Sequence, residues 1–162
     1  MKQTLLIITT LAGCLLLSGC WEQQSHVETE MSPEAISEES HQSKALGLDQ
    51  LLNGRSAVET FHEAIGNGNV VVDFYATWCP PCKAMLPIVD ELSQELDTVT
   101  FIKIDVDKFG EIAAGFKVGD ETFSIGSVPQ FFIFKDGKLQ DHFNGGLPKA
   151  QFHEKIKHKL GL

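Results

Sequence analysis

Two cysteines, Cys79 and Cys82, are the residues of this chain whose type and spacing best suit them to chemistry. They stand two positions apart in the segment ATWCPPCKAM, with only prolines between them. Such a pair can form half of a metal site, close a small structural disulfide, or act as a redox pair that exchanges disulfides with other proteins. The remainder of the chain helps to distinguish these three interpretations.

The histidines do not favour the metal interpretation. A structural zinc site needs four ligands, commonly a second Cys or His pair at similarly close spacing. The six histidines, at positions 26, 41, 62, 142, 153 and 158, form no such pair. A purely structural disulfide would close so small a loop that it would add little stability. We therefore expect no metal and no cofactor, and we favour a redox pair.

The position of the pair also suits redox chemistry. Cys79 follows the apolar, β-rich run 70–75 and opens a helical pattern. A helix N-terminus stabilises a thiolate, so we expect Cys79 at the exposed end as the nucleophile and Cys82 one turn further in as the resolving thiol. The two prolines lack N–H groups, so the amides of Cys82 and Lys83 should stabilise the thiolate most.

Hydrophobic patterning predicts an α/β domain around this pair. A central mixed sheet of about four strands, with helices on both faces, follows from the order of the elements. The expected elements are a helix at 56–65, a strand at 70–75, a helix from 79 to about 96 with Pro87 inside it, a strand at 98–107, a short helix at 111–116, a hairpin at 129–143 that turns at Asp136-Gly137, and a helix from Pro148 to the end of the printed chain.

Several segments resemble thioredoxin-like proteins. VVDFYATWCPPCKAMLPIV is similar to the active-site segment of that family, and SVPQFFIFKDGK is similar to its cis-proline loop, strand and turn. FIKIDVD, NGG and the last helix also match, so the resemblance covers about residues 56–161. It implies the thioredoxin fold and thiol–disulfide oxidoreductase activity.

The resemblance also implies a role for a buried acid. Asp73, in the middle of its strand, would exchange a proton with Cys82, with Lys103 as its partner. Burial disfavours a carboxylate, so Asp73 can hold a proton near neutrality. The alternative is a structural Asp73 that is tied to Lys103.

Three further residues are implied to form the substrate surface. Trp78 would shape the surface around Cys79, or it would simply pack in the core. Pro129 would be cis and would leave the backbone of Val128 available to a substrate strand. The chain departs from the family in its Pro-Pro dipeptide, its longer segment 117–127, and the lack of an evident edge strand before Ser56.

The front of the chain predicts export. Residues 1–19 have one lysine and an apolar stretch, as in a secretory signal, and LSGC resembles a lipobox that would place lipid on Cys20. Lipidation at Cys14, a plain signal peptide and an uncleaved anchor are the alternatives. Residues 20–45 predict an acidic, disordered tether, and residues 46–162 the folded domain.

These observations predict a membrane-tethered thiol–disulfide oxidoreductase of the bacterial cell envelope, facing the periplasm or the cell exterior. Its partners would be envelope proteins with thiols or disulfides and, for a reductant, a membrane electron donor. We expect a monomer that acts as a reductant. The alternatives are a disulfide oxidase or isomerase, and a non-catalytic binding module for a copper or haem apoprotein. The net charge of −9 argues against nucleic acid as a partner.

Overall fold

The computed structural model describes residues 44–162. The predicted signal, the lipidation site at Cys20 or Cys14, and nearly all of the predicted tether lie outside the described residues. Within the described part, no helix is both long enough and apolar enough to span a bilayer.

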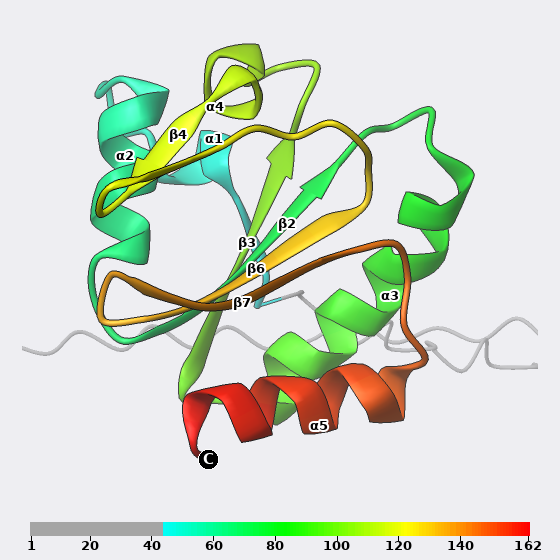
Figure 1. Ribbon diagram of the computed structural model, residues 1–162. Coiled ribbons are helices and arrows are strands. Elements are labelled where there is room, and N and C mark those ends of the chain that lie inside the picture. Colours follow the sequence, from blue (N-terminus) through cyan, green and yellow to red (C-terminus); the bar gives the residue numbers. More distant parts are fainter. Residues whose placement is uncertain (1–43) are drawn as a thin grey trace, which may run out of the picture. The chain divides into compact units, whose positions relative to one another are not determined.

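A five-stranded mixed sheet forms the centre of the domain (Figure 1), in the order β1-β3-β2-β6-β7. β1 and β2 both run parallel to β3, whereas β6 runs antiparallel to both of its neighbours, β2 and β7. The strands are β1 (Leu46–Gly47), β2 (Asn69–Tyr75), β3 (Val99–Asp105), β6 (Gln130–Lys135) and β7 (Lys138–Asn144).

The predicted mixed sheet is confirmed, but the predicted number of strands was one too low. The missed strand, β1, pairs Leu46 with Ile102 and Gly47 with Lys103 at the edge of the sheet. A strand of two residues is too short to show an alternating pattern, which explains why the sequence before Ser56 gave no sign of it.

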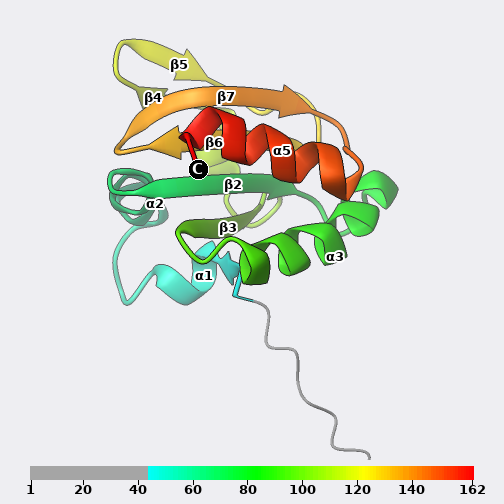
Figure 2. The same ribbon diagram turned by 90° about the horizontal axis from the view of Figure 1, so that it is seen from below.

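Helices cover both faces of the sheet, as predicted. Figures 1 and 2 show α2 on one face and α3 with α5 on the other. One buried cluster joins Phe61 of α2 to Val72 and Phe132 of the sheet, and a second joins Leu92 of α3 to Phe131. The helices are α1 (Leu48–Leu51), α2 (Ala57–Ile65), α3 (Pro80–Glu95), α4 (Gly110–Ala114) and α5 (Lys149–Leu160).

Local sequence signals set several of these boundaries. The Ser56 hydroxyl accepts a hydrogen bond from the Glu59 amide at 3.3 Å, as a capping residue of α2 should. α3 continues through Pro87. Asp136 and Gly137, with φ of 48° and 75°, form the predicted two-residue turn between β6 and β7.

The segment after α4 differs from the prediction. The predicted helix at 111–116 ends at Ala114, and Phe116 instead begins β4 (Phe116–Val118), which pairs with β5 (Glu121–Phe123) in a separate two-stranded sheet. The rings of Phe116 and Phe123 lie 5.2 and 5.6 Å from that of Phe132, so the hairpin is packed onto the core. The longer segment 117–127 is therefore largely an ordered hairpin.

Candidate active site

Cys79 and Cys82 form a disulfide at the start of α3. β2 leads to Cys79, which is the N-cap residue of the helix, and the Cys82 amide donates a hydrogen bond to Cys79 Sγ at 3.2 Å. This is the predicted role of the Cys82 amide. The Lys83 amide, expected to act in the same way, instead donates to the Cys79 carbonyl at 3.2 Å.

Both sulfurs are well packed in this disulfide state. Cys79 is 3% exposed and Cys82 is 1% exposed, and both pack against Ala76. The expected exposed position of Cys79 is therefore not observed with the disulfide closed.

Trp78 lies on the surface beside the pair. It is 65% exposed, so the core-packing alternative was wrong. Its indole Nε1 donates to Asp107 Oδ2 at 2.8 Å, and the Asp107 amide donates to Asp105 Oδ1 at 3.0 Å. Asp107 thus orients the indole next to Cys79. The sequence analysis did not single out Asp107, although it is the last residue of the predicted strand 98–107.

The cis-proline loop lies across from Cys79. The Val128–Pro129 peptide bond is cis, as the resemblance implies, and Cys79 Sγ is 3.6 Å from the Val128 carbonyl oxygen. The Pro129 carbonyl accepts from the Gly145 amide at 2.8 Å, which ties this loop to the end of β7. The structure therefore brings Trp78, Val128 and Pro129 to the side of the disulfide, and their contact with a substrate stays a prediction.

Asp73 is a buried acid on β2, three residues before Ala76. It is 1% exposed, and its two carboxyl oxygens are the buried side-chain atoms of the described residues that have no hydrogen-bond partner. Burial raises the pKa of Asp73 to about 7, the charge of Lys103 opposes this rise, and the charge of Asp90 adds to it. A group that titrates near neutrality is suited to exchange a proton with Cys82.

Lys103, the expected partner of Asp73, forms its ion pair with Asp90 and not with Asp73. Lys103 and Asp73 are opposite each other in the β2–β3 register, yet Lys103 Nζ donates to Asp90 Oδ1 at 3.1 Å. The alternative of an Asp73 tied to Lys103 is therefore not observed, and Lys103 acts on Asp73 through space. Sequence reasoning missed Asp90, an acid of α3 that directly follows the buried Val89 in the sequence.

The arrangement suits thiol–disulfide exchange. Cys79 lies at a helix N-terminus beside an exposed indole and a cis-proline loop, and Asp73, an acid that titrates near neutrality, lies on the strand that leads to it. Within residues 44–162, no group of three or more His, Cys, Asp or Glu side chains is placed to hold a metal ion.

Comparisons with known proteins agree with this geometry. The thioredoxin family matches residues 55–158. Thioredoxin Y2 of Arabidopsis thaliana is 39% identical over 109 residues, which are 65% of this chain and 61% of that protein. A thioredoxin of Mycoplasmoides gallisepticum is 42% identical over 91 residues, which are 56% of this chain and 84% of the relative.

Solved structures give the same result. A thioredoxin from Nicotiana alata has a TM-score of 0.56 at 30% identity, over 72% of this chain and 93% of its own. Oxidised mitochondrial thioredoxin 3 of Saccharomyces cerevisiae has a TM-score of 0.53 at 32% identity, over 74% and 98% respectively. The chain, in which Cys79 and Cys82 form a disulfide, therefore belongs to the thioredoxin family of thiol–disulfide oxidoreductases.

Proposed function

We propose that this chain is a membrane-tethered thiol–disulfide oxidoreductase of the bacterial cell envelope, and that it reduces disulfides in envelope proteins through Cys79 and Cys82. The observation that carries the proposal is the Cys79–Cys82 disulfide at the N-terminus of α3, with the cis Val128–Pro129 bond beside it. A helix N-terminus favours the thiolate of Cys79 over that of Cys82, which lies a turn inside the helix.

The reaction moves two electrons from the reduced pair to the partner. The Cys79 thiolate attacks one sulfur of the partner disulfide, and the other partner sulfur leaves as a thiolate that takes up a proton. Cys82 then gives its proton to the Asp73 carboxylate and attacks Cys79 Sγ. The Cys79–Cys82 bond forms, and the second partner sulfur leaves as a thiolate.

The residues between the cysteines support the proposed direction of electron flow. Thioredoxin has a reduction potential of about −270 mV, whereas strong thiol oxidases lie near about −120 mV because their reduced form is stabilised. Pro80 and Pro81 offer neither a histidine nor an N–H group to stabilise the Cys79 thiolate further. This favours a reductant, and it agrees with relatives that are named thioredoxins. Equilibration of the pair with glutathione measures the potential, and a value near that of strong oxidases would reverse the proposed direction.

The tether and the location rest on the sequence. LSGC at residues 17–20 and the glutamates that follow support a lipid-anchored protein whose domain stands away from the membrane. A reductant in the envelope needs electrons from a membrane donor, and the tether would keep the domain near such a partner. Its substrates would be envelope proteins with accessible disulfides.

A trapping experiment tests the mechanism. In Cys82→Ser, the mixed disulfide on Cys79 has no internal thiol to release it, so covalent complexes with envelope proteins should accumulate. They should appear as dithiothreitol-sensitive, high-mass bands on non-reducing gels of acid-quenched cells. Cys79→Ser is the matched control and should trap at least ten-fold less, because Cys82 lies a turn inside α3, whereas Cys79 lies at the helix N-terminus that stabilises a thiolate.

The outcome also separates the alternatives. Equal trapping by both variants would contradict the roles assigned to the two cysteines. Trapping by neither, together with no dithiothreitol-dependent reduction of insulin, would favour the non-catalytic binding module.

A further inference from the structure

Asp90 of α3 forms an ion pair with Lys103, the lysine that lies opposite the buried Asp73. Its Oδ1 accepts from Lys103 Nζ at 3.1 Å, with side-chain exposures of 34% for Asp90 and 19% for Lys103. Lys103 sits opposite Asp73 in the β2–β3 register, so two carboxyl groups compete for one ammonium. The hydrogen bond goes to Asp90, and the oxygens of Asp73 remain without a hydrogen-bond partner.

Few charged groups surround Asp73. β3 contributes Lys103 and α3 contributes Asp90, and these two are the charges that act on the Asp73 carboxyl. On β2 itself, Tyr75 lies two residues further along the same face. β6 places the apolar Phe131 opposite Asp73, and the buried residues of α5 are apolar. The redox disulfide itself, Cys79–Cys82, packs on Ala76 beyond Asp73. Burial is therefore the largest influence on the protonation of Asp73, and the position of the Lys103 ammonium is the largest influence among the neighbouring charges.

We propose that Asp90 is a positioning residue for the proton transfer at Cys82: it holds the Lys103 ammonium against α3 and so leaves the Asp73 carboxyl without an ion-pair partner. The role of Asp90 in proton transfer at Cys82 rests on the proposed function, but its effect on the titration of Asp73 does not.

A direct ion pair between Lys103 and Asp73 would keep Asp73 from acting as an acid. A cation in contact with a carboxyl group lowers its pKa by about 1–3 units. Asp73 would then stay ionised at neutral pH and would have no proton to give to Cys82 when that sulfur leaves the disulfide. Asp90 prevents this by engaging Lys103, and its own negative charge further favours the protonated acid.

Asp90→Asn tests the proposal directly. The carboxyl carbon of Asp73 is followed by ¹³C NMR against pH in the oxidised protein. With Lys103 released, the midpoint should fall by about one pH unit from its wild-type value near 7. Asp90→Glu keeps the charge and should restore the wild-type midpoint. Because Asp90 is 34% exposed, these changes should leave the fold intact, and circular dichroism checks this.

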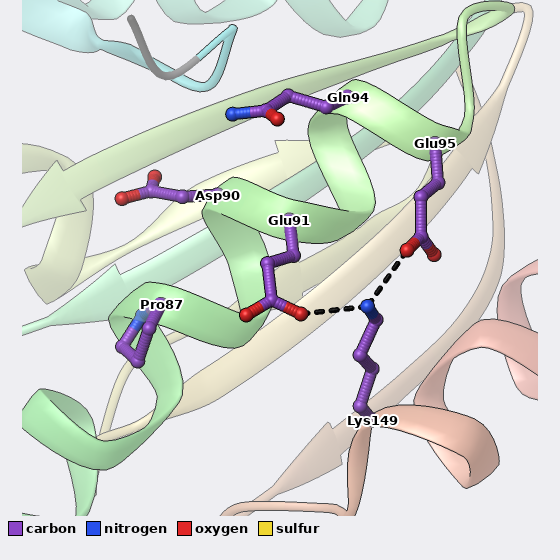
Figure 3. Close-up of a pocket in the computed structure, with 6 residues that line it drawn as sticks. All are labelled: Pro87, Asp90, Glu91, Gln94, Glu95 and Lys149. Carbon is purple, nitrogen blue, oxygen red and sulfur yellow. Dashed lines mark hydrogen bonds and ion pairs between the residues drawn. The ribbon is translucent and has the colours of Figure 1, made fainter. Parts of the chain in front are cut away.

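Glu91 offers a matched control on the same helix. Figure 3 shows Glu91 directed at Lys149 and Asp90 directed away from it. Glu91 Oε2 is 2.6 Å from Lys149 Nζ, so Glu91→Gln removes the same charge from α3 without releasing Lys103. Its Asp73 titration should match the wild type. A shift as large as that of Asp90→Asn would mean that only the overall charge of α3 matters, and would overturn the proposal.

A double variant shows whether Asp90 acts through Lys103. In a Lys103→Met background, Asp90→Asn should shift the Asp73 midpoint by less than half as much as it does alone. An equal shift in both backgrounds would leave Asp90 acting by its own charge, contrary to the proposal. An unchanged midpoint in Asp90→Asn alone would also overturn it.

Kinetics supply the functional measurement. The rate at which dithiothreitol reduces the Cys79–Cys82 disulfide should depend on pH with a midpoint that moves with that of Asp73 in each variant. A pH profile unmoved in Asp90→Asn would overturn the assigned role in proton transfer. Because the NMR titration needs no partner protein, loss of trapping in Cys82→Ser would contradict the proposed function while leaving the titration result to decide the inference on its own.

Discussion

At the scale of single residues, Asp73 is the group that should couple stability to pH. Its pKa is about 7 in the folded protein, chiefly because burial disfavours the charge, and about 3.9 in an unfolded chain. Between these values the folded state binds more protons than the unfolded state, so the contribution of Asp73 to stability falls as the pH rises from about 4 to about 7. Below pH 4 both states are protonated and the penalty disappears.

Asp73→Asn should therefore stabilise the protein in a pH-dependent way. The gain in the free energy of unfolding should be near zero below about pH 4 and level off above about pH 7, at no more than about 4 kcal/mol. Urea denaturation at pH 4, 6 and 8 measures it. Asp120→Asn, at an exposed position, is the control and should show no such trend. A gain of the same size at all three pH values would show that Asp73 does not titrate in this range.

The same substitution should slow the chemistry. Without an acid at position 73, proton exchange at Cys82 depends on solvent, and a positioned general acid or base typically contributes about 10²–10⁴-fold. Reduction of the disulfide by dithiothreitol near pH 7 should slow by at least about ten-fold, and its pH profile should lose the midpoint near 7. An unchanged profile would leave Asp73 with a packing role only.

Sequence motifs predicted the site residues that lie within one short segment of the chain. The disulfide pair and the cis bond before Pro129 are where the resemblance placed them. The hydrogen bond of Lys103 to Asp90 was not predicted, because spacing along the chain does not tell which carboxyl group an ammonium will reach. That choice depends on how α3 packs over β3, which brings Asp90 within 3.1 Å.

At the scale of elements, aromatic packing holds the β4–β5 hairpin to the sheet. Phe116 is 4% exposed and its ring lies 5.0 Å from that of Phe61 and 5.6 Å from that of Phe74. Phe116→Ala removes these contacts and leaves a cavity, so it should lower the free energy of unfolding by about 3–5 kcal/mol. Val58→Ala, at a position that is 40% exposed, should cost about 1 kcal/mol or less.

Urea denaturation of the two variants checks this prediction. A loss below about 1 kcal/mol for Phe116→Ala would mean that the hairpin is not anchored by this ring. Hydrogen exchange of the Ile125 amide, which donates to the Ala113 carbonyl at 2.8 Å, should speed up in Phe116→Ala and not in Val58→Ala.

Helices and strands were predictable where the sequence has a long hydrophobic pattern or a recognisable turn. The buried run of β2 and the Asp136-Gly137 turn give strong local signals. β4 and β5 have three residues each, and their exposed positions include Lys117 and Glu121, so the segment resembled a polar loop. Only the contacts of Phe116 and Phe123 with the core make it a hairpin, and such contacts are not visible in local sequence.

At the scale of the whole molecule, the proposed lipid tether would decide where the redox pair works. LSGC predicts acylation of Cys20, and two or more acyl chains give stable membrane anchoring where one chain does not. Cys20→Ala should therefore move the protein from the membrane to the soluble fraction and abolish labelling by radioactive palmitate. The soluble Cys20→Ala protein should still reduce insulin with dithiothreitol at the wild-type rate, because Cys79 and Cys82 lie in the predicted folded domain, residues 46–162, and Cys20 does not.

Cys14→Ala is the matched control for this prediction, since LAGC at residues 11–14 is the competing site. Cys14→Ala should still be labelled by radioactive palmitate and should stay in the membrane fraction. The reverse pattern, with label lost in Cys14→Ala and kept in Cys20→Ala, would move the anchor to Cys14. Label in neither the wild type nor the variants would contradict the lipoprotein assignment. Because substrates and the electron donor would be met at the membrane, Cys20→Ala in a Cys82→Ser background should also trap fewer envelope proteins than Cys82→Ser alone.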